Sequence, residues 1–310
     1  MSQLAPESAE AAACAVKAGD RIGEGPAWDR RGQRLLWVDQ ERGVVHEARA
    51  QGSGWSETRH WDLKRRLAAV VPRGRGGLVV AGGDEIFALD ESGEVASLAK
   101  LDIDPARARI NDAKCDPGGR LWAATLTADF ADGDASLYRV DPDGHVALIL
   151  GGITIGNGLE WSPDGAFLYF VDSLTLSVDR FEFDVRRGTI ANRHRLVSFA
   201  RGEGAPNGLT VDESGNLWVA ATGAGEVRCF TPEGRLTGRI RIATPGATSC
   251  AFGGPDGGDL FITSLGRRMP DVARSIGLSE TMMTNDGPGA GDLYVCRPGV
   301  RGPAATPFAG

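Results

Sequence analysis

Three features of the sequence predict an all-β protein with the fold of a six-bladed β-propeller. The first is a recurring hairpin, in which two short apolar strands flank a glycine-containing turn, as in residues 157–172 and 207–220. The second is the spacing of these hairpins, which recur roughly every 42 to 50 residues, a repeat length typical of a propeller blade. The third is a further pair of strands with apolar–polar alternation between the hairpins, best seen in residues 136–149 and 226–236. Four strands per unit and six units give the predicted ring.

The six hairpin units begin near Glu24, Leu67, Asn111, Asn157, Asn207 and Thr248. We therefore expect residues 19–310 to form a single six-bladed propeller domain, preceded by an alanine-rich N-terminal lead-in over residues 1–18. A pair of β-sandwiches is the alternative architecture, and the regularity of the repeat disfavours it. The 44 glycines suit the many tight turns of a propeller better than they suit long helices.

Composition and charge exclude several classes of protein. The formal net charge of −7 argues against a nucleic-acid-binding surface, which is normally basic. The first ten residues contain no basic segment followed by an apolar one, so we expect no secretory signal, and no stretch reaches the roughly 18 apolar residues of a membrane span. The five cysteines show no CxxC spacing, which indicates reduced thiols rather than a zinc site or a disulfide framework. The expected location is cytoplasmic, and the sequence leaves the oligomeric state open.

Four of the hairpin units carry a polar residue at an equivalent position near their start. These residues are Glu24, Asn111, Asn157 and Asn207. In a propeller the innermost strands line a central channel, so these side chains should converge at one mouth of the channel. Carboxylate and amide oxygens are the ligands that a hard divalent cation takes. The alternative is that asparagine before glycine serves only a turn with positive φ, but the set together with Glu24 favours a metal site.

Four segments of the chain resemble the signatures of one known family. They are residues 23–28 (GEGPAW), 109–112 (RIND), 157–165 (NGLEWSPDG) and 252–256 (FGGPD). In this order they are similar to the gluconolactonase, regucalcin and luciferin-regenerating-enzyme family, and the resemblance extends from about residue 20 to the end of the chain. It implies a six-bladed propeller and, as in many members, a metal-dependent lactonase activity, with relatives that hydrolyse organophosphates.

The resemblance also implies roles for individual residues. Glu24 and Asn157 match two protein ligands of the family metal. Arg109 and Asn111 match residues that contact the substrate, with the asparagine also near the metal. We therefore expect Glu24, Asn157 and Asn207 to hold one divalent metal ion, with Ca²⁺ favoured and Zn²⁺, Mg²⁺, Mn²⁺ or Fe²⁺ as alternatives. The expected partner is a small-molecule substrate.

One position departs from the family pattern. The family motif here is usually Pro-Asp-Gly, whose aspartate both binds the metal and is the favoured general base, whereas this chain has Pro206-Asn207-Gly208. An amide oxygen can coordinate a cation, but an amide cannot accept a proton from water. Three explanations are open: an inactivated variant, a different reaction, or a substitute carboxylate. The candidates for a substitute carboxylate are Glu203, Asp129 and Asp132.

Two functional hypotheses follow for a site whose catalytic positions are Glu24 and Asn207. The first is a divalent-metal-dependent hydrolase of a lactone or related cyclic ester, in which the metal acts as Lewis acid and activates water at the central channel. The second is a propeller that binds a small molecule or catalyses a non-hydrolytic step, such as isomerisation or cyclisation, which the amide at position 207 favours. A WD-type interaction scaffold is disfavoured because the Gly-His and Trp-Asp signatures do not recur from blade to blade.

Overall fold

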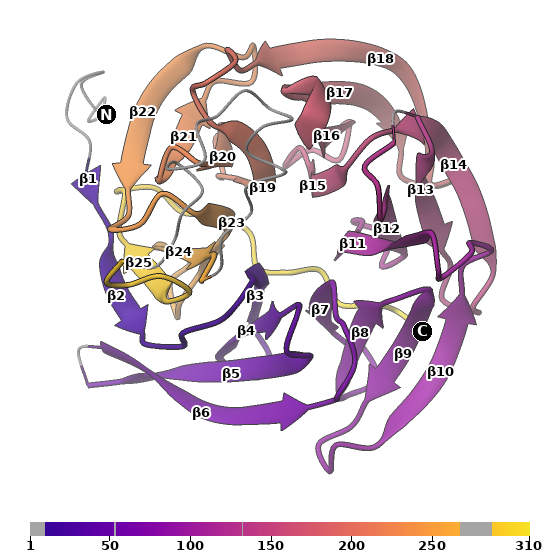
Figure 1. The fold of residues 1–310 in the computed structure, drawn as a ribbon, viewed down its shortest axis with the longest axis horizontal. Helices are drawn as coiled ribbons and strands as arrows, with labels where there is room; N and C mark the ends of the chain where they lie inside the picture. Colours follow the sequence, from indigo (N-terminus) through magenta and orange to yellow (C-terminus); the bar gives the residue numbers. More distant parts are fainter. Residues whose placement is uncertain (1–9, 53, 132, 267–286) are drawn as a thin grey trace.

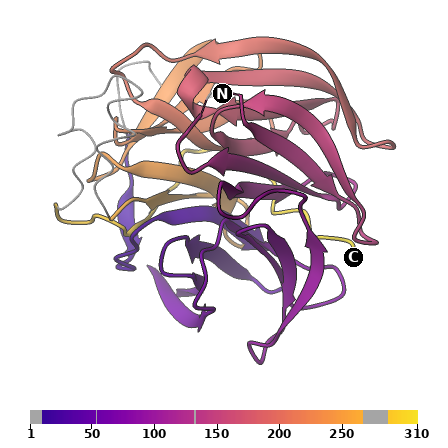
Figure 2. The same cartoon turned by 45° about the vertical axis from the view of Figure 1, so that its right-hand side comes forward.

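Six small sheets are arranged as blades around a central channel (Figure 1). The structure is a computed structural model that describes residues 10–52, 54–131, 133–266 and 287–310. Over these ranges the elements are 25 strands and one short 3-10 helix, η1 (Ser173–Thr175). The turned view shows the blades side by side around the same channel (Figure 2). The predicted six-bladed β-propeller is confirmed. In the described part of the chain, no helix is long and apolar enough to cross a membrane.

Each blade is an antiparallel sheet whose first strand lies nearest the channel. Blade 1 contains β3 (Gly23–Asp29), β4 (Arg34–Asp39), β5 (Val44–Gln51) and β6 (Gly54–Asp62). Blade 2 contains β7 (Ala69–Pro72), β8 (Leu78–Gly82), β9 (Glu85–Leu89) and β10 (Val95–Lys100). Blade 3 contains β11 (Ala108–Cys115), β12 (Leu121–Thr127), β13 (Ala135–Val140) and β14 (Val146–Ile153).

The remaining three blades follow the same plan, with N-terminal strands added to the last two. Blade 4 contains β15 (Gly156–Trp161), β16 (Phe167–Asp172), β17 (Ser177–Asp184) and β18 (Thr189–Ser198). Blade 5 contains β19 (Ala205–Val211), β20 (Leu217–Thr222), β21 (Glu226–Phe230) and β22 (Leu236–Arg241), with β1 (Glu10–Ala11) paired parallel to β22. Blade 6 contains β23 (Ala247–Gly253), β24 (Asp259–Ser264), β25 (Leu293–Cys296) and β2 (Ala13–Val16).

The ring is closed by a strand from the opposite end of the chain. β2 pairs antiparallel with β25, so that Ala13 faces Val295 and Cys14 faces Tyr294. The outermost strand of blade 6 therefore comes from the N-terminal segment, and the sheet joins the two ends of the chain. Closure of this kind leaves no gap between the last blade and the first.

The hydrophobic core consists of six clusters, and each cluster fills the space between two neighbouring blades. The cluster between blades 6 and 1 joins Trp28 and Trp37 to Phe261 and Leu293. The cluster between blades 3 and 4 contains Trp122 and Trp161 among its members. Because the second strands of the blades are buried on both faces, they read as continuous apolar runs such as residues 35–38 and 168–171.

The C-terminal segment, residues 302–310, crosses one face of the ring and ends beside blades 2 and 3 (Figure 1). Phe308 is almost fully buried in the cluster between these two blades. Its N–H donates to the carbonyl of Pro72 at 2.9 Å, and its carbonyl accepts from the N–H of Gly74 at 2.7 Å. The N–H of Ala309 donates to the carbonyl of Gly119 at 2.9 Å. The segment thus ties the last blade to the second and third.

Candidate active site at one mouth of the central channel

The four predicted polar residues lie inside the innermost strands of blades 1, 3, 4 and 5, rather than in loops before them. Each of these strands has an irregular register at this point. The shifts fall between residues 24 and 27 in β3, 110 and 112 in β11, 156 and 159 in β15, and 206 and 209 in β19. A β-bulge breaks the alternation of a strand and redirects a side chain. The bulges accordingly occur where the polar side chains reach the channel mouth.

All five predicted site residues line one cavity of about 90 Å³. They are Glu24, Arg109, Asn111, Asn157 and Asn207. Glu24 and Asn157 are buried, and the other three are partly exposed. The structure therefore brings together residues that are far apart in the sequence, as the repeat predicted. Their chemical roles stay predictions.

Hydrogen bonds between neighbouring blades hold the amides of blades 3 and 4 in place. Asn111 Nδ2 donates to Asn157 Oδ1 at 2.8 Å and to the carbonyl of Gly156 at 3.0 Å. Asn157 Nδ2 donates to Ser173 Oγ at 2.7 Å, and Ser173 Oγ donates to the carbonyl of Pro206 at 2.7 Å. This network fixes the orientation of both amides. It also links three blades around the cavity.

Asn207 is oriented by its neighbour on the next strand of its own blade. Its Nδ2 donates to Thr222 Oγ1 at 3.0 Å, and Thr222 Oγ1 donates to the carbonyl of Ala247 at 2.6 Å. Asn207 Oδ1 is buried and has no hydrogen-bond partner among the described residues. A buried amide oxygen without a partner is uncommon, and it indicates a position at which a ligand or ion can bind.

Glu24 is the only carboxylate among the described residues that line this cavity, and it is 7% exposed. Burial, and then the nearby carboxyl of Asp112, raise the pKa of Glu24 well above its ordinary value. The N–H of Gly25, 3.3 Å from Oε2, and a hydrogen bond with Asn207 partly oppose this rise. A buried carboxylate of this kind is stabilised by a bound cation.

These observations fit a divalent cation held by oxygen ligands. Glu24 would supply the carboxylate, the unpartnered Oδ1 of Asn207 would supply a second oxygen, and Asn157 would supply a third. In the described ranges there is no cluster of three or more His, Cys, Asp or Glu side chains. A donor set of one carboxylate and two amides is of a different composition, suited to a hard cation rather than to zinc.

Three further residues of the cavity were missed by sequence reasoning. Gln40 donates from Nε2 to the carbonyl of Asn111 at 2.9 Å, while Ser173 and Thr222 hold the two candidate amides. Ser173 follows the aspartate that ends β16, and Thr222 ends β20, so both lie at equivalent ends of second strands. Their equivalent positions in the repeat could have identified Ser173 and Thr222 from the sequence.

The candidate substitutes for the missing base do not reach this cavity where the structure describes them. Glu203 and Asp129 are exposed and are not part of its lining. Asp132 lies outside the described residues. Asp112 is a buried carboxyl that sequence reasoning missed, and burial raises its pKa to about 6. It lines a neighbouring cavity of the channel rather than this one, although it is close enough to Glu24 to raise the pKa of that group.

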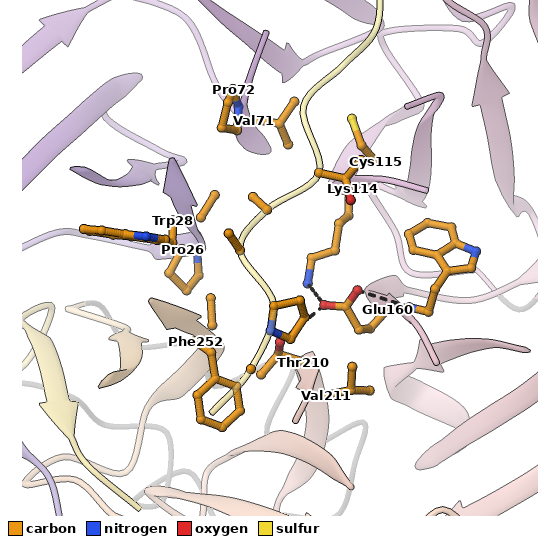
Figure 3. A pocket seen from close by; sticks show the side chains of 18 of the residues that line it. Pro26, Trp28, Val71, Pro72, Lys114, Cys115, Glu160, Thr210, Val211 and Phe252 are labelled. Atoms are coloured by element: carbon orange, nitrogen blue, oxygen red, sulfur yellow. Dashed lines mark hydrogen bonds and ion pairs between the residues drawn. The ribbon is translucent and has the colours of Figure 1, made fainter. Parts of the chain in front are cut away.

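A second cavity of about 800 Å³ occupies the other end of the channel (Figure 3). It is lined by the later residues of the inner strands and by residues 302–307 of the C-terminal segment. Lys114 Nζ pairs with Glu160 Oε2 at 3.0 Å and donates to the carbonyl of Leu209 at 3.0 Å. Thr210 Oγ1 donates to the same carboxylate oxygen at 3.3 Å. Lys114, Glu160 and Thr210 are thus paired with one another.

The two glycines that follow the candidate amides have a steric role. Gly158 and Gly208 lie within β15 and β19 and do not have positive φ. A Cβ on Gly158 would lie 2.5 Å from the carbonyl oxygen of Asn207 in the neighbouring blade. A Cβ on Gly208 would collide with the side chain and backbone of Ser249 in the blade after that. Glycine here permits the close approach of inner strands.

Comparison with known proteins is consistent with this architecture. Residues 22–266 match the family described as "SMP-30/Gluconolactonase/LRE-like region". Regucalcin of Danio rerio is 33% identical over 259 residues, which cover 81% of this chain and 85% of the relative. A Bacillus subtilis protein named "Putative sugar lactone lactonase YvrE" is 31% identical over 291 residues, or 93% of this chain and 95% of the relative. The solved structure of a protein named as a calcium-binding protein, regucalcin, from Agrobacterium tumefaciens has a TM-score of 0.84 at 25% identity, covering 98% of this chain and 99% of that one. The chain belongs to the SMP-30/gluconolactonase/LRE-like family.

Proposed function

We propose that this protein is a divalent-metal-dependent hydrolase of a lactone or related cyclic ester, acting at the cavity lined by Glu24, Asn157 and Asn207. The observation that carries the proposal is that one cavity holds both the buried carboxyl group of Glu24 and the unpartnered amide oxygen of Asn207. Membership of a family with gluconolactonase in its description supports lactonase-type activity. The relative named as a sugar lactone lactonase supports it as well. The name of the Agrobacterium protein supports calcium as the ion.

Glu24, Asn157 and Asn207 would hold the ion, which when bound supplies a Lewis acid for the ester carbonyl and lowers the pKa of a bound water. Arg109 carries a permanent positive charge in the cavity lining. We assign it to orienting the substrate and stabilising negative charge as it develops on the ester oxygen. Asn111 is assigned to substrate positioning, because its two hydrogen bonds to blade 4 hold its side chain in a fixed orientation.

The amide at position 207 limits the rate that this site can reach. With Asn207, the described lining offers one formal carboxylate, so a hard cation should bind more weakly than at a site with two. The same amide cannot remove a proton from the attacking water. We therefore propose that hydrolysis by this chain is slow, and that restoring an aspartate would accelerate it.

The first test compares this chain with Asn207→Asp on a panel of aldonolactones, alkyl lactones and aromatic lactones, with added Ca²⁺, Mg²⁺, Mn²⁺ or Zn²⁺. General-base catalysis contributes about 10²–10⁴-fold, so the Asp form should be at least about 100-fold faster in kcat. Equal rates would show that another group supplies the base. If neither form hydrolyses any lactone while a metal is bound, the non-hydrolytic alternative, isomerisation or cyclisation at the same site, replaces this proposal.

The second test removes the carboxylate charge while preserving the shape of the side chain. Glu24→Gln should abolish both bound metal, measured by elemental analysis after gel filtration, and lactone hydrolysis. Glu203→Gln is a matched control, because Glu203 is exposed and does not line the cavity. Full activity and metal content in Glu24→Gln would overturn the assignment of Glu24 as a ligand.

A further inference from the structure

In the second cavity, a network of polar side chains joins the inner strands of blades 3, 4 and 5 (Figure 3). Lys114 of β11 pairs through Nζ with Glu160 Oε2 of β15 at 3.0 Å, and the same ammonium group donates to the carbonyl of Leu209 in β19. Thr210 Oγ1 of β19 donates to Glu160 Oε2 at 3.3 Å, which completes a triangle of contacts. We call the side chains of Lys114, Glu160 and Thr210 the channel clamp.

Each member of the channel clamp follows the candidate site amide of its own strand by three residues, which span about 10 Å at most. The three strands belong to different sheets, so the backbone hydrogen bonds within each sheet do not fix their relative positions. The spacing of the strands therefore depends on contacts between blades. The amides are Asn111, Asn157 and Asn207, and the clamp residues that follow them are Lys114, Glu160 and Thr210.

The same blades are also joined at the level of the amides, but there the contacts are between uncharged groups. Asn111 Nδ2 donates to Asn157 Oδ1 across the junction of blades 3 and 4, and Ser173 of blade 4 donates to the carbonyl of Pro206 in β19. The channel clamp instead contains an ion pair whose side chains are mostly buried, 24% exposed in its lysine and 14% in its glutamate. Removing the lysine would leave the carboxylate mostly buried without its counterion.

We propose that the channel clamp positions the candidate metal ligands, with Lys114 as its central positioning residue. Asn157 and Asn207 lie on different strands, so the distance between their oxygens follows the distance between β15 and β19. A functional site requires its side chains to be placed within about 0.5 Å. The ammonium group of Lys114 contacts both strands at once and holds them at a fixed separation. This inference rests on the proposed function, because it takes these amides as ligands of the ion.

Lys114→Met tests the channel clamp because positioning and charge predict opposite results. The substitution removes a positive charge near the site, and this loss alone would tighten the binding of a divalent cation. Loss of positioning would weaken binding by about tenfold, as is typical when groups that orient metal ligands are removed. We expect the weaker binding, with the dissociation constant for Ca²⁺ measured by calorimetry on protein shown to be folded by circular dichroism. An unchanged or smaller dissociation constant overturns the inference and leaves the lactonase proposal standing.

Arg34→Met is the matched control, because Arg34 is also a buried, ion-paired cation. Its partners Asp29 and Glu47 belong to its own blade, and Arg34 does not line the candidate site. This variant should bind Ca²⁺ as the wild type does. A similar loss of affinity in the two variants would mean that Lys114→Met acts through general destabilisation, which overturns the inference.

A milder variant carries the test if Lys114→Met does not fold. Thr210→Val removes one hydrogen bond of the channel clamp and keeps the shape of the side chain. It should weaken Ca²⁺ binding about threefold, the factor that one lost hydrogen bond corresponds to. An unchanged dissociation constant in this variant likewise overturns the inference.

A measurement on the metal-free protein separates this inference from the proposed function. NMR of protein labelled with ¹⁵N at asparagine follows the side-chain amide of Asn111, which donates to two acceptors of blade 4. In Lys114→Met its hydrogens should exchange with water about fivefold faster, whereas Arg34→Met should leave the rate unchanged. If the wild type binds no divalent cation, the proposed function fails, and faster exchange still supports the channel clamp. An unchanged exchange rate in Lys114→Met overturns the inference whether or not a metal binds.

Discussion

Gly158 and Gly208 show how single residues allow the candidate site to form. Asparagine followed by glycine commonly marks a turn, and that was the alternative to a metal site in the sequence. In the structure both pairs are in strands, and each glycine occupies a place where a Cβ would strike the next blade. The absence of a side chain lets neighbouring inner strands approach, which carries the preceding amides toward one another. The glycine therefore belongs to the site as much as the asparagine does.

Gly208→Ala should destabilise the fold by about 1–3 kcal/mol, because the added methyl group overlaps Ser249 and the strands must separate to admit it. Urea denaturation measures the change. Gly151→Ala is the matched control: Gly151 also lies in a strand without positive φ, and the nearest atom to an added Cβ is 3.9 Å away. Similar losses in the two variants would show that close packing is not the reason for Gly208.

At the scale of elements, the inner hairpins were predictable because their signal is local. Two apolar strands and the turn between them lie within about 15 residues of sequence, and the unit recurs in every blade. The bulges were not predictable, since an extra residue in a strand has no distinct composition. The register of β2 on β25 was not predictable either, because β2 has only four residues and its partner lies at the other end of the chain.

The C-terminal segment is an element without any periodic pattern, and its contribution can be tested at Phe308. Phe308→Ala should cost about 3–5 kcal/mol of unfolding free energy, as is typical when a fully buried phenylalanine is truncated. The same urea titration on Leu148→Ala provides the control, because Leu148 is 62% exposed. A loss below about 1 kcal/mol would mean that residues 302–310 rest on the ring without stabilising it.

At the scale of the whole molecule, the candidate site exists only because the ring is complete. Its polar residues come from blades 1, 3, 4 and 5, and its lining also includes Ile22 and Leu265, which form a bridge between blades 1 and 6. The repeat predicted this convergence, since equivalent positions of a ring face the same mouth. It could not predict that position 207 holds an amide in place of the usual base, or which apolar side chains complete the lining, because those depend on individual substitutions and on connecting segments.

Global stability should also depend on pH through His46 of blade 1. Burial alone would lower the pKa of His46, but the carboxylates of Asp20 and Glu57, each 3.0 Å from a ring nitrogen, outweigh it and raise the pKa to about 9. The folded state thus holds a proton that the unfolded state releases near pH 6.5. This contribution is fully present below about pH 6.5 and is lost as the pH rises through about 9.

Urea denaturation between pH 6 and 9.5 should show unfolding free energy falling by about 2–3 kcal/mol more in the wild type than in His46→Gln. His194→Gln, at an exposed position of β18, should retain the wild-type slope. Parallel curves for wild type and His46→Gln would exclude a protonated His46 as the source of the dependence.

Closure of blade 6 by β2 has a consequence for how the protein is made. Residues 13–16 leave the ribosome early, but their partner, residues 293–296, is among the last to be synthesised. At roughly 5–20 residues per second, the first strand waits for on the order of tens of seconds without its partner. During that interval the five earlier blades can form their hairpins, while the last blade still lacks its two outer strands. A nascent chain interrupted before residue 293 would therefore present an open sheet edge and an unpaired strand at once, which makes strand exchange between two unfinished chains the characteristic misassembly of this ring.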